Sequence, residues 1–254
     1  MELNFSHASI RQIQAALAEF GVVLLRHSIQ PDVVTRYRDA LASFFRDDRD
    51  NRLGDISAEE RTALDRGDVL PATFLRYSGL DLAEYFVPLH ELAQRVLVKP
   101  NLYNQTFLTV QADSTNPGLN PHTDGIIQGT TDAVLAFWSP MRSCGVDAPG
   151  LSIFPASREK VLAYLRRSFP DKQIPGWYST TEWERPFHPD NVCREFGPPW
   201  CPEIHSGDVM IFTNWTIHGS HVRPTMANPR SAIVQRWRSD DWRKPTWFER
   251  LTGR

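Results

Sequence analysis

Two histidines and one aspartate are the residues of this chain whose types and spacing could bind a metal ion. His122 and Asp124 lie two residues apart in NPHTDG, after the run LYNQTFLTVQ, so in extended chain their side chains would point the same way. His218 lies far along the chain, in TNWTIHGSH, directly after the apolar run DVMIFTN. If two neighbouring strand ends meet, two imidazoles and one carboxylate would bind one face of a metal. This is the ligand set expected of iron(II) oxygenases.

Each part of this pattern also has a common structural explanation. Asp124 followed by Gly125 is an ordinary turn, and a single histidine is often a surface or capping group. The chain has 8 histidines, so a distal partner is easy to find, and His221 competes with His218. The same ligands with a bound water would make a catalytic zinc site. A hydrolytic zinc enzyme and a non-catalytic metal-binding β-barrel protein therefore stay open.

An arginine supplies a second chemical feature. Arg230 follows an Asn-Pro turn and opens the run SAIVQRW, where its guanidinium could bind a carboxylate through two hydrogen bonds. A dicarboxylate cosubstrate would need such an anchor. Arg223, Arg236 and Arg238 are rivals, and Arg236 and Arg238 share a strand face with Arg230. We favour Arg230 for its position relative to the turn where the metal would lie.

The elements that would position these residues differ between the two halves of the chain. In the first hundred residues, apolar spacing predicts a helix from Ile10 that ends at Gly21, followed by the short strand VVLLR. Further helices are predicted at about 31–45 and 82–98. The charged segment 46–70 is expected to be a solvated loop with one short helix, and a mobile lid is the alternative.

The second half is rich in β-branched and aromatic residues. Its expected strands are LYNQTFLTVQ, AVLAFWS, LSIF, DVMIFTN and SAIVQRW, and only SREKVLAYLRR reads as a convincing helix. This order favours an antiparallel sandwich or barrel. The segment from about 169 to 202 is expected to be irregular, as an aromatic lid or a packed cover. We expect one domain over residues 1–254, helix-rich to about residue 100 and β-rich from about 101 to 240.

Composition narrows the partners. The chain has 254 residues with 28 Lys plus Arg against 30 Asp plus Glu, so no basic field would attract nucleic acid or an acidic membrane. No signal peptide and no transmembrane segment are expected. The 3 cysteines are irregularly spaced, which argues against a disulfide framework and favours a cytoplasmic location. We expect a small-molecule substrate and a monomer or homodimer.

Six pieces of the chain together carry a family resemblance. They are FGVVLLRHSIQPDVV, PHTDG, AVLAFWSPM, APGLSIFPASREK, GDVMIFTNWTIHGSH and NPRSAIVQRW, in this order. The chain resembles the phytanoyl-CoA dioxygenase family of 2-oxoglutarate oxygenases, although PASR stands where the family has a PGSH-like turn. The resemblance implies a mainly β fold with flanking α-helices and a double-stranded β-helix (jelly-roll, cupin-like) core.

The resemblance also implies cofactors and their ligands. His122, Asp124 and His218 take the places of the iron(II) ligands, and Arg230 takes that of the arginine that binds the distal carboxylate of 2-oxoglutarate. O2 is the third reactant. Gln111 falls where many relatives have a lysine and could contact the cosubstrate or the substrate. Because Asp124 is present, the chain does not resemble the halogenases, which lack this carboxylate.

The implied reaction releases succinate and CO2 and oxidises an unactivated C–H bond. Hydroxylation is the usual outcome, and desaturation, cyclisation and epimerisation are alternatives. The substrate is expected to be a small or medium-sized organic metabolite, as in natural-product biosynthesis. One face of the strand LYNQTFLTVQ, with Gln105 and Phe107, could line the substrate cavity, and the other face is the alternative. Trp177 is a candidate lid residue.

Overall fold

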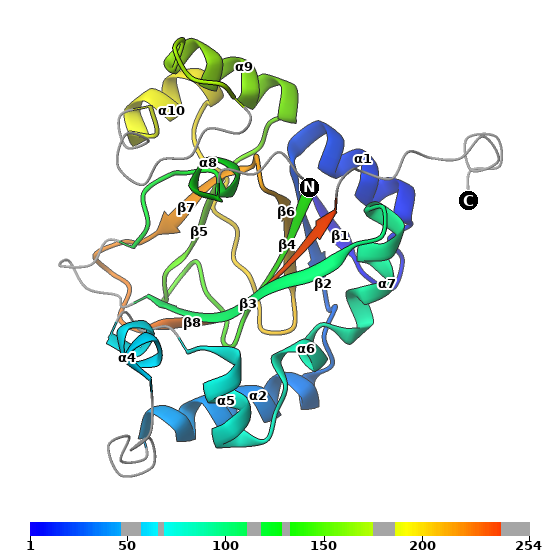
Figure 1. Ribbon diagram of the computed structural model, residues 1–254, viewed down its shortest axis with the longest axis vertical. Helices are drawn as coiled ribbons and strands as arrows, with labels where there is room; N and C mark the ends of the chain where they lie inside the picture. Colours follow the sequence, from blue (N-terminus) through cyan, green and yellow to red (C-terminus); the bar gives the residue numbers. More distant parts are fainter. Residues whose placement is uncertain (47–56, 66–68, 111–117, 129–132, 175–185, 240–254) are drawn as a thin grey trace.

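The structure is a computed structural model that describes residues 1–46, 57–65, 69–110, 118–128, 133–174 and 186–239. Two β-sheets face each other in these regions, and helices cover their outer faces (Figure 1). No helix in these regions has the length and apolar character needed to cross a membrane.

The larger sheet has 6 strands in the order β1-β2-β6-β4-β8-β3, and its pairs are antiparallel except for β1 with β2. The smaller sheet pairs β5 with β7 in antiparallel register. This arrangement confirms the jelly-roll fold class expected from the sequence. The strands are β1 Glu2–Asn4, β2 Val22–Arg26, β3 Asn101–Val110, β4 Ala133–Pro140, β5 Gly150–Phe154, β6 Val209–Thr213, β7 Ile217–His221 and β8 Arg230–Ser239.

Most helices precede β3, and the other three described helices lie between β3 and β6. The first helix of the chain shows both of its end signals: Ser9 and Gln12 form a capping box at the start, and Gly21 ends the helix in the left-handed conformation. The helices are α1 Ile10–Phe20, α2 Pro31–Arg46, α4 Ala58–Asp65, α5 Pro71–Ser78, α6 Leu82–Tyr85, α7 Val87–Val96, α8 Asp124–Gln128, α9 Arg158–Ser168 and α10 Pro189–Phe196.

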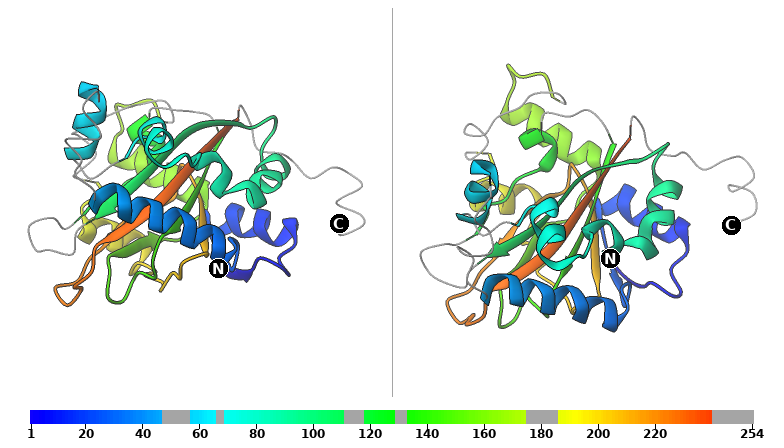
Figure 2. Two further views of the ribbon diagram at one scale, coloured as in Figure 1. Left: turned by 90° about the horizontal axis from the view of Figure 1, so that it is seen from below. Right: turned by 60° about the horizontal axis from the view of Figure 1, so that its bottom comes forward.

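Strand periodicity divides the interior into layers. On β2, Val22 and Leu24 face the smaller sheet, whereas Val23 and Leu25 pack against helices. The helix-side cluster joins the outer face of the larger sheet to α1, α2, α5, α6 and α7, which Figure 2 shows running along that sheet. A third cluster joins α9 and α10 to the outer face of β5 and β7. The apolar cluster that contains Val22 and Leu24, called the inner cluster, therefore fills the space between the sheets together with the site described below.

Apart from α8, which was not expected and lies at the site described below, the helix pattern departs from the sequence expectation in three places. The helix expected at about 82–98 is two helices, because Pro88 cannot donate a backbone hydrogen bond and instead lies at the start of α7. Helix α5, with Pro71 at its first position, was not expected. Helix α10 lies within the segment 169–202, which was expected to be irregular, and His188 caps it.

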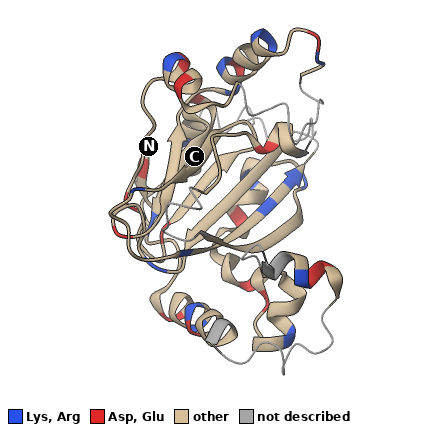
Figure 3. Ribbon diagram, turned by 90° about the vertical axis from the view of Figure 1, so that its left-hand side faces the viewer, with Lys and Arg blue, Asp and Glu red and all other residues tan. Residues whose placement is uncertain are grey.

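Two strands also differ from the sequence expectation, whereas the short helix in 46–70 and the balanced charge agree with it. Strands β1 and β7 were not expected, since β1 is only 3 residues long and β7 is polar. The predicted helix within 46–70 is present as α4. In the view of Figure 3, acidic and basic residues are interspersed along the helices, in agreement with the net charge of −2.

Candidate metal centre

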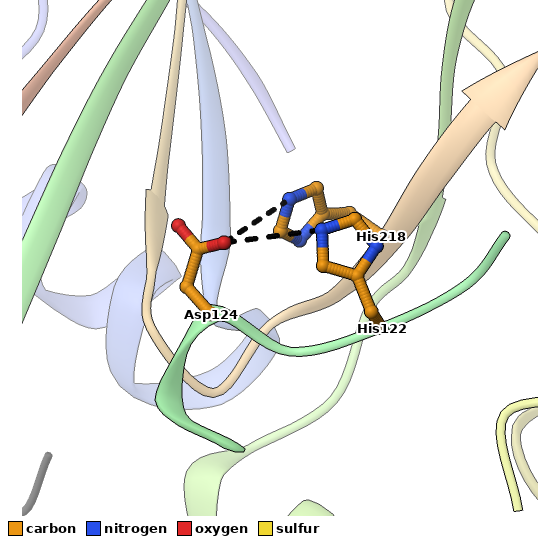
Figure 4. A group of neighbouring side chains, drawn as sticks. All are labelled: His122, Asp124 and His218. Atoms are coloured by element: carbon orange, nitrogen blue, oxygen red, sulfur yellow. Dashed lines mark ion pairs between the residues drawn. The ribbon is translucent and has the colours of Figure 1, made fainter. Parts of the chain in front are cut away.

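The side chains of His122, Asp124 and His218 converge between the two sheets (Figure 4). One ligand atom from each lies within 4.8 Å of the others. The Asp124 carboxylate oxygen Oδ1 is 3.8 Å from His122 Nε2 and 4.0 Å from His218 Nε2. All three residues are buried, with exposures of 5%, 4% and 6%. Two imidazoles and one carboxylate at this spacing can bind a divalent metal on one face.

The backbone brings the two histidines together. His122 forms an isolated antiparallel bridge with His218, in which the two backbone N–H groups donate to the opposite carbonyls at 2.8 and 3.0 Å. His218 lies in its own strand, β7, rather than at the end of β6 as expected from the sequence. Asp124 begins helix α8. The two side chains converge as expected, but Asp124 is the first residue of a helix rather than part of an extended chain.

A close approach to Gly125 connects the two halves of the triad. The Gly125 N–H donates to the Asn214 carbonyl at 2.7 Å. A Cβ at Gly125 would lie 2.9 Å from the indole of Trp215, which is 2% exposed. Because Trp215 lies in the turn between β6 and β7, only glycine after Asp124 lets this turn approach α8 so closely. The turn positions both Asp124 and His218.

Hydrogen bonds fix the orientation of both imidazoles. His122 Nδ1 lies 2.8 Å from the Asn120 carbonyl oxygen, and His218 Nδ1 lies 3.0 Å from that of Thr216. A carbonyl oxygen can only accept, so each Nδ1 carries the hydrogen and each Nε2 presents its lone pair to the centre of the triad. The ring of Phe212 lies 4.5 Å from that of His218 and limits its rotation.

Burial and charge set the protonation states of the triad. Burial lowers the pKa of His122, and burial together with His122 lowers the pKa of His218 to about 4. Burial alone would raise the pKa of the Asp124 carboxyl, but the charge of Arg236 and the two imidazoles hold it well below its ordinary value. At neutral pH the site therefore offers two neutral imidazoles and one carboxylate, as metal binding requires.

Arg230 is a buried cation without an anionic partner among the described residues. It is 4% exposed, and its Nη1 donates to the Gly150 carbonyl at 2.8 Å. Its Nε is buried without a hydrogen-bond partner, and its guanidinium carbon lies 5.4 Å from the centre of the Trp138 ring. Burial lowers the pKa of Arg230 to about 10. A buried cation in this state fits a carboxylate ligand, which would satisfy both its charge and its free N–H.

The three rival arginines have other positions. Arg236 donates from Nε to Asp124 Oδ2 at 2.8 Å, so it is bound to the triad itself. Arg238 is exposed and lies over the Tyr103 ring, and Arg223 lies beyond the end of β7. His221, the rival of His218, is not part of the triad.

The expected substrate residues fall into two groups. Gln111 and Trp177 lie outside the described residues. Phe107 is fully buried in the helix-side cluster, with its ring centre 4.7 Å from that of Phe74. Gln105 lies on the same face of β3. The expectation that this face lines the site is therefore wrong, since the helices cover it. The opposite face carries Asn104, whose Oδ1 accepts from Arg236 Nη1 at 3.2 Å.

The described part of the segment 169–202 packs as a cover. Phe187 is 1% exposed and lies in the cluster outside the smaller sheet. The backbone of Trp200 pairs with Ile153 on β5, and its side chain packs against the inner cluster. The contact of Arg236 with Asp124 and Asn104 was not predicted from the sequence, which considered Arg236 only as a rival anchor to Arg230.

Comparisons with known proteins agree with this geometry. The sequence model of the family described as phytanoyl-CoA dioxygenase (PhyH) matches residues 17–232. A search of the curated proteins found no match. Among solved structures, EvdMO1 has 16% identity and a TM-score of 0.60, and the match covers 92% of this chain but 51% of EvdMO1, so this chain spans about half of its length.

Two further structures match over most of their own length. AviO1 from Streptomyces viridochromogenes Tue57 has 13% identity and a TM-score of 0.61, with coverage of 93% of this chain and 97% of AviO1. The epimerase SnoN, solved in complex with Fe3+, alpha ketoglutarate and nogalamycin RO, has 15% identity and a TM-score of 0.52, with coverage of 91% and 83%. At these identities the likeness shows a shared fold.

Proposed function

This chain belongs to the phytanoyl-CoA dioxygenase family of non-haem iron(II)- and 2-oxoglutarate-dependent enzymes, and we propose that it hydroxylates an unactivated C–H bond of a small or medium-sized organic metabolite. The observation that carries the proposal is the combination of a buried His-Asp-His triad with a buried arginine, Arg230, that has no anionic partner among the described residues. A hydrolytic zinc site would use the triad but would have no need for Arg230.

In this proposal, the triad residues hold the iron. His122 and His218 would bind it through Nε2, since their Nδ1 hydrogens are committed to backbone carbonyls, and Asp124 would bind it through Oδ1. When bound, iron would supply the chemistry of O2 activation coupled to the oxidative decarboxylation of 2-oxoglutarate to succinate and CO2. The protein contributes ligands that are oriented and in the correct protonation state before the metal arrives.

Arg230 is proposed to bind the distal carboxylate of 2-oxoglutarate. Its Nε, which has no partner in the described part of the chain, would donate to one carboxylate oxygen. Trp138 stacks against the guanidinium and restricts its movement, and the Gly150 carbonyl fixes Nη1. Because the site is buried, the ion pair is screened by little water and is stronger than one on the surface. Gln111 stays a proposed second contact for this cosubstrate.

The substrate would bind next to the triad. Its class is proposed from the absence of any recognisable coenzyme A motif in the sequence and from SnoN, an epimerase from nogalamycin biosynthesis. Hydroxylation is the outcome that we propose, and the product distinguishes it from the alternatives. A hydroxylated product gains one oxygen atom, a desaturated or cyclised product loses two hydrogen atoms, and an epimer keeps its mass.

Three further properties belong to the proposal. A cytoplasmic location is supported by Cys144, Cys193 and Cys201, which are free thiols. A monomer or homodimer and a single oxygenase domain over residues 1–254 stay predictions.

The test is succinate formation under defined conditions. Purified protein with Fe(II), ascorbate, 2-oxoglutarate and O2 is expected to release succinate slowly without a substrate, and faster when a library of small metabolites includes the substrate. His218→Ala is expected to abolish both. Release that is independent of O2, or unchanged in His218→Ala, would reject the oxygenase function. Turnover of an ester or amide without O2 would instead support the zinc hydrolase.

A further inference from the structure

Arg236 holds one oxygen of the Asp124 carboxylate. Its side chain is 14% exposed, and its Nε donates to Asp124 Oδ2 at 2.8 Å. Its Nη1 donates to Asn104 Oδ1 at 3.2 Å. Since Asn104 is the register partner of Arg236 on β3, the larger sheet itself fixes the guanidinium. One arginine therefore connects the edge of this sheet to the carboxylate of the triad.

The two oxygens of Asp124 have different surroundings. Oδ2 accepts the hydrogen bond from Arg236, whereas Oδ1 faces Nε2 of both histidines, at 3.8 and 4.0 Å. Within the described regions no group hydrogen-bonds to Oδ1. At its other end, the residue is fixed by the start of α8 and by the contact of Gly125 with Asn214. The carboxylate cannot rotate without losing its bond to Arg236.

A second buried aspartate in the same protein shows what a purely structural ion pair looks like. Asp208 is fully buried and pairs with Arg26 through Oδ2 at 2.7 Å. Its Oδ2 also accepts from the His205 N–H, and its Oδ1 accepts from the His27 N–H. Both oxygens of Asp208 are thus satisfied by the protein. Asp124 differs in that only the oxygen facing away from the histidines is satisfied.

We propose that Arg236 is a positioning residue that makes Asp124 a one-oxygen metal ligand, with Asn104 holding the guanidinium in place. This inference rests on the proposed function. A carboxylate that binds through both oxygens would occupy an additional coordination position, which the cosubstrate or O2 needs. By retaining Oδ2, Arg236 keeps that position open, and it also neutralises the charge of the carboxylate before metal binds.

Cobalt(II) binding tests this proposal without turnover. Co(II) replaces Fe(II) as the probe, because its visible absorption reports the number and geometry of its ligands and its affinity can be titrated. The variants are Arg236→Gln, Arg236→Lys and Asn104→Ala. Arg238→Gln is the matched control, since it lies on the same strand and none of its described contacts involves Asp124. Circular dichroism of each metal-free variant shows whether it is folded.

Arg236→Gln is expected to bind Co(II) roughly 10–100-fold more weakly and with an altered visible spectrum, as for other residues that orient metal ligands. Arg236→Lys, which keeps the charge, is expected to restore part of the affinity. Asn104→Ala is expected to change both readouts in the same direction but less, and Arg238→Gln is expected to match the wild type.

Two results would overturn the inference, and they are distinguishable. If Arg236→Gln is folded and keeps the wild-type affinity and spectrum, Arg236 has no positioning role, and the proposed function is unaffected. If Arg236→Gln does not fold, unchanged affinity and spectrum in Arg236→Lys and Asn104→Ala lead to the same rejection. If the wild type does not bind Co(II) at the triad, the proposed function fails and this inference fails with it.

Discussion

Arg230 and Arg236 lie on the same face of β8, yet their surroundings shift their pKa values in opposite directions. Arg236 is paired with the Asp124 carboxylate, and although burial opposes its charge, the carboxylate raises its pKa above the ordinary value. Arg230 hydrogen-bonds to a backbone carbonyl and has no carboxylate partner among the described residues, and burial lowers its pKa to about 10. A buried charge without a partner is costly. Arg236 has an internal carboxylate partner, and the difference supports the proposal that the partner of Arg230 is a bound ligand.

The largest expected effect is that of breaking the internal pair. Arg236→Met leaves Asp124 buried and unpaired, so we expect the free energy of unfolding of the metal-free protein to fall by about 3–5 kcal/mol. Urea denaturation of the metal-free protein measures it, with Arg238→Met as the control for loss of a surface arginine. A fall below about 1 kcal/mol would place the pair among weak surface ion pairs.

Removing Arg230, the proposed anchor of 2-oxoglutarate, should weaken cosubstrate binding without destabilising the metal-free protein. Arg230→Met is expected to weaken 2-oxoglutarate binding roughly 100-fold, about 2.7 kcal/mol, because the distal carboxylate loses its partner. The metal-free protein is expected to be as stable as the wild type or more stable, since an unpaired buried charge is removed. Isothermal titration with 2-oxoglutarate and urea denaturation measure the two effects. Unchanged affinity would move the anchor away from Arg230.

Gly125, which follows Asp124 and fixes its backbone, offers a third test of the difference between the triad and Arg230. Gly125→Ala would place a Cβ 2.9 Å from Trp215. We expect a loss of about 1–3 kcal/mol in unfolding free energy, as for other overpacked sites, together with weaker Co(II) binding. Affinity for 2-oxoglutarate, measured on protein saturated with metal, should change little because Arg230 is untouched. A stable variant with wild-type Co(II) affinity would show that α8 does not need this close approach.

The smallest effect should come from replacing Arg230 with lysine, a cation of different shape. Arg230→Lys keeps the charge but loses the planar fork that binds a carboxylate through two hydrogen bonds. We expect roughly tenfold weaker 2-oxoglutarate binding, about 1.4 kcal/mol, and no change in Co(II) affinity. If lysine were as poor as methionine in the binding titration, geometry would matter more than charge at this position.

Much of the β-rich core could be predicted from the sequence, because nearly continuous apolar runs such as β4 and β6 indicate burial on both faces of the strand. Strand β7 could not, since IHGSH is polar and owes its place to pairing with β5 and to the bridge with His122. His218 on this strand was found through its residue type and through the family resemblance.

Which face of β3 borders the site could not be predicted either. The strand carries polar and apolar residues on both faces, so periodicity alone does not distinguish them. Only the helices packed over Phe107 decide it. The pairing of Arg236 with Asp124 could not be predicted for the same reason. It depends on the position of α8 relative to β8, which is a property of the tertiary structure.

The most direct test of the central claim is an anaerobic titration of the Fe(II)-loaded protein with 2-oxoglutarate, followed by visible absorption. Binding of the keto acid to iron in a site of this kind produces a weak charge-transfer band. We predict a saturable band in the wild type, no band in His218→Ala, and a band in Arg230→Met only at much higher 2-oxoglutarate concentrations. Absence of the band in the wild type, or an equal band in His218→Ala, would contradict the assignment of the triad as the iron site.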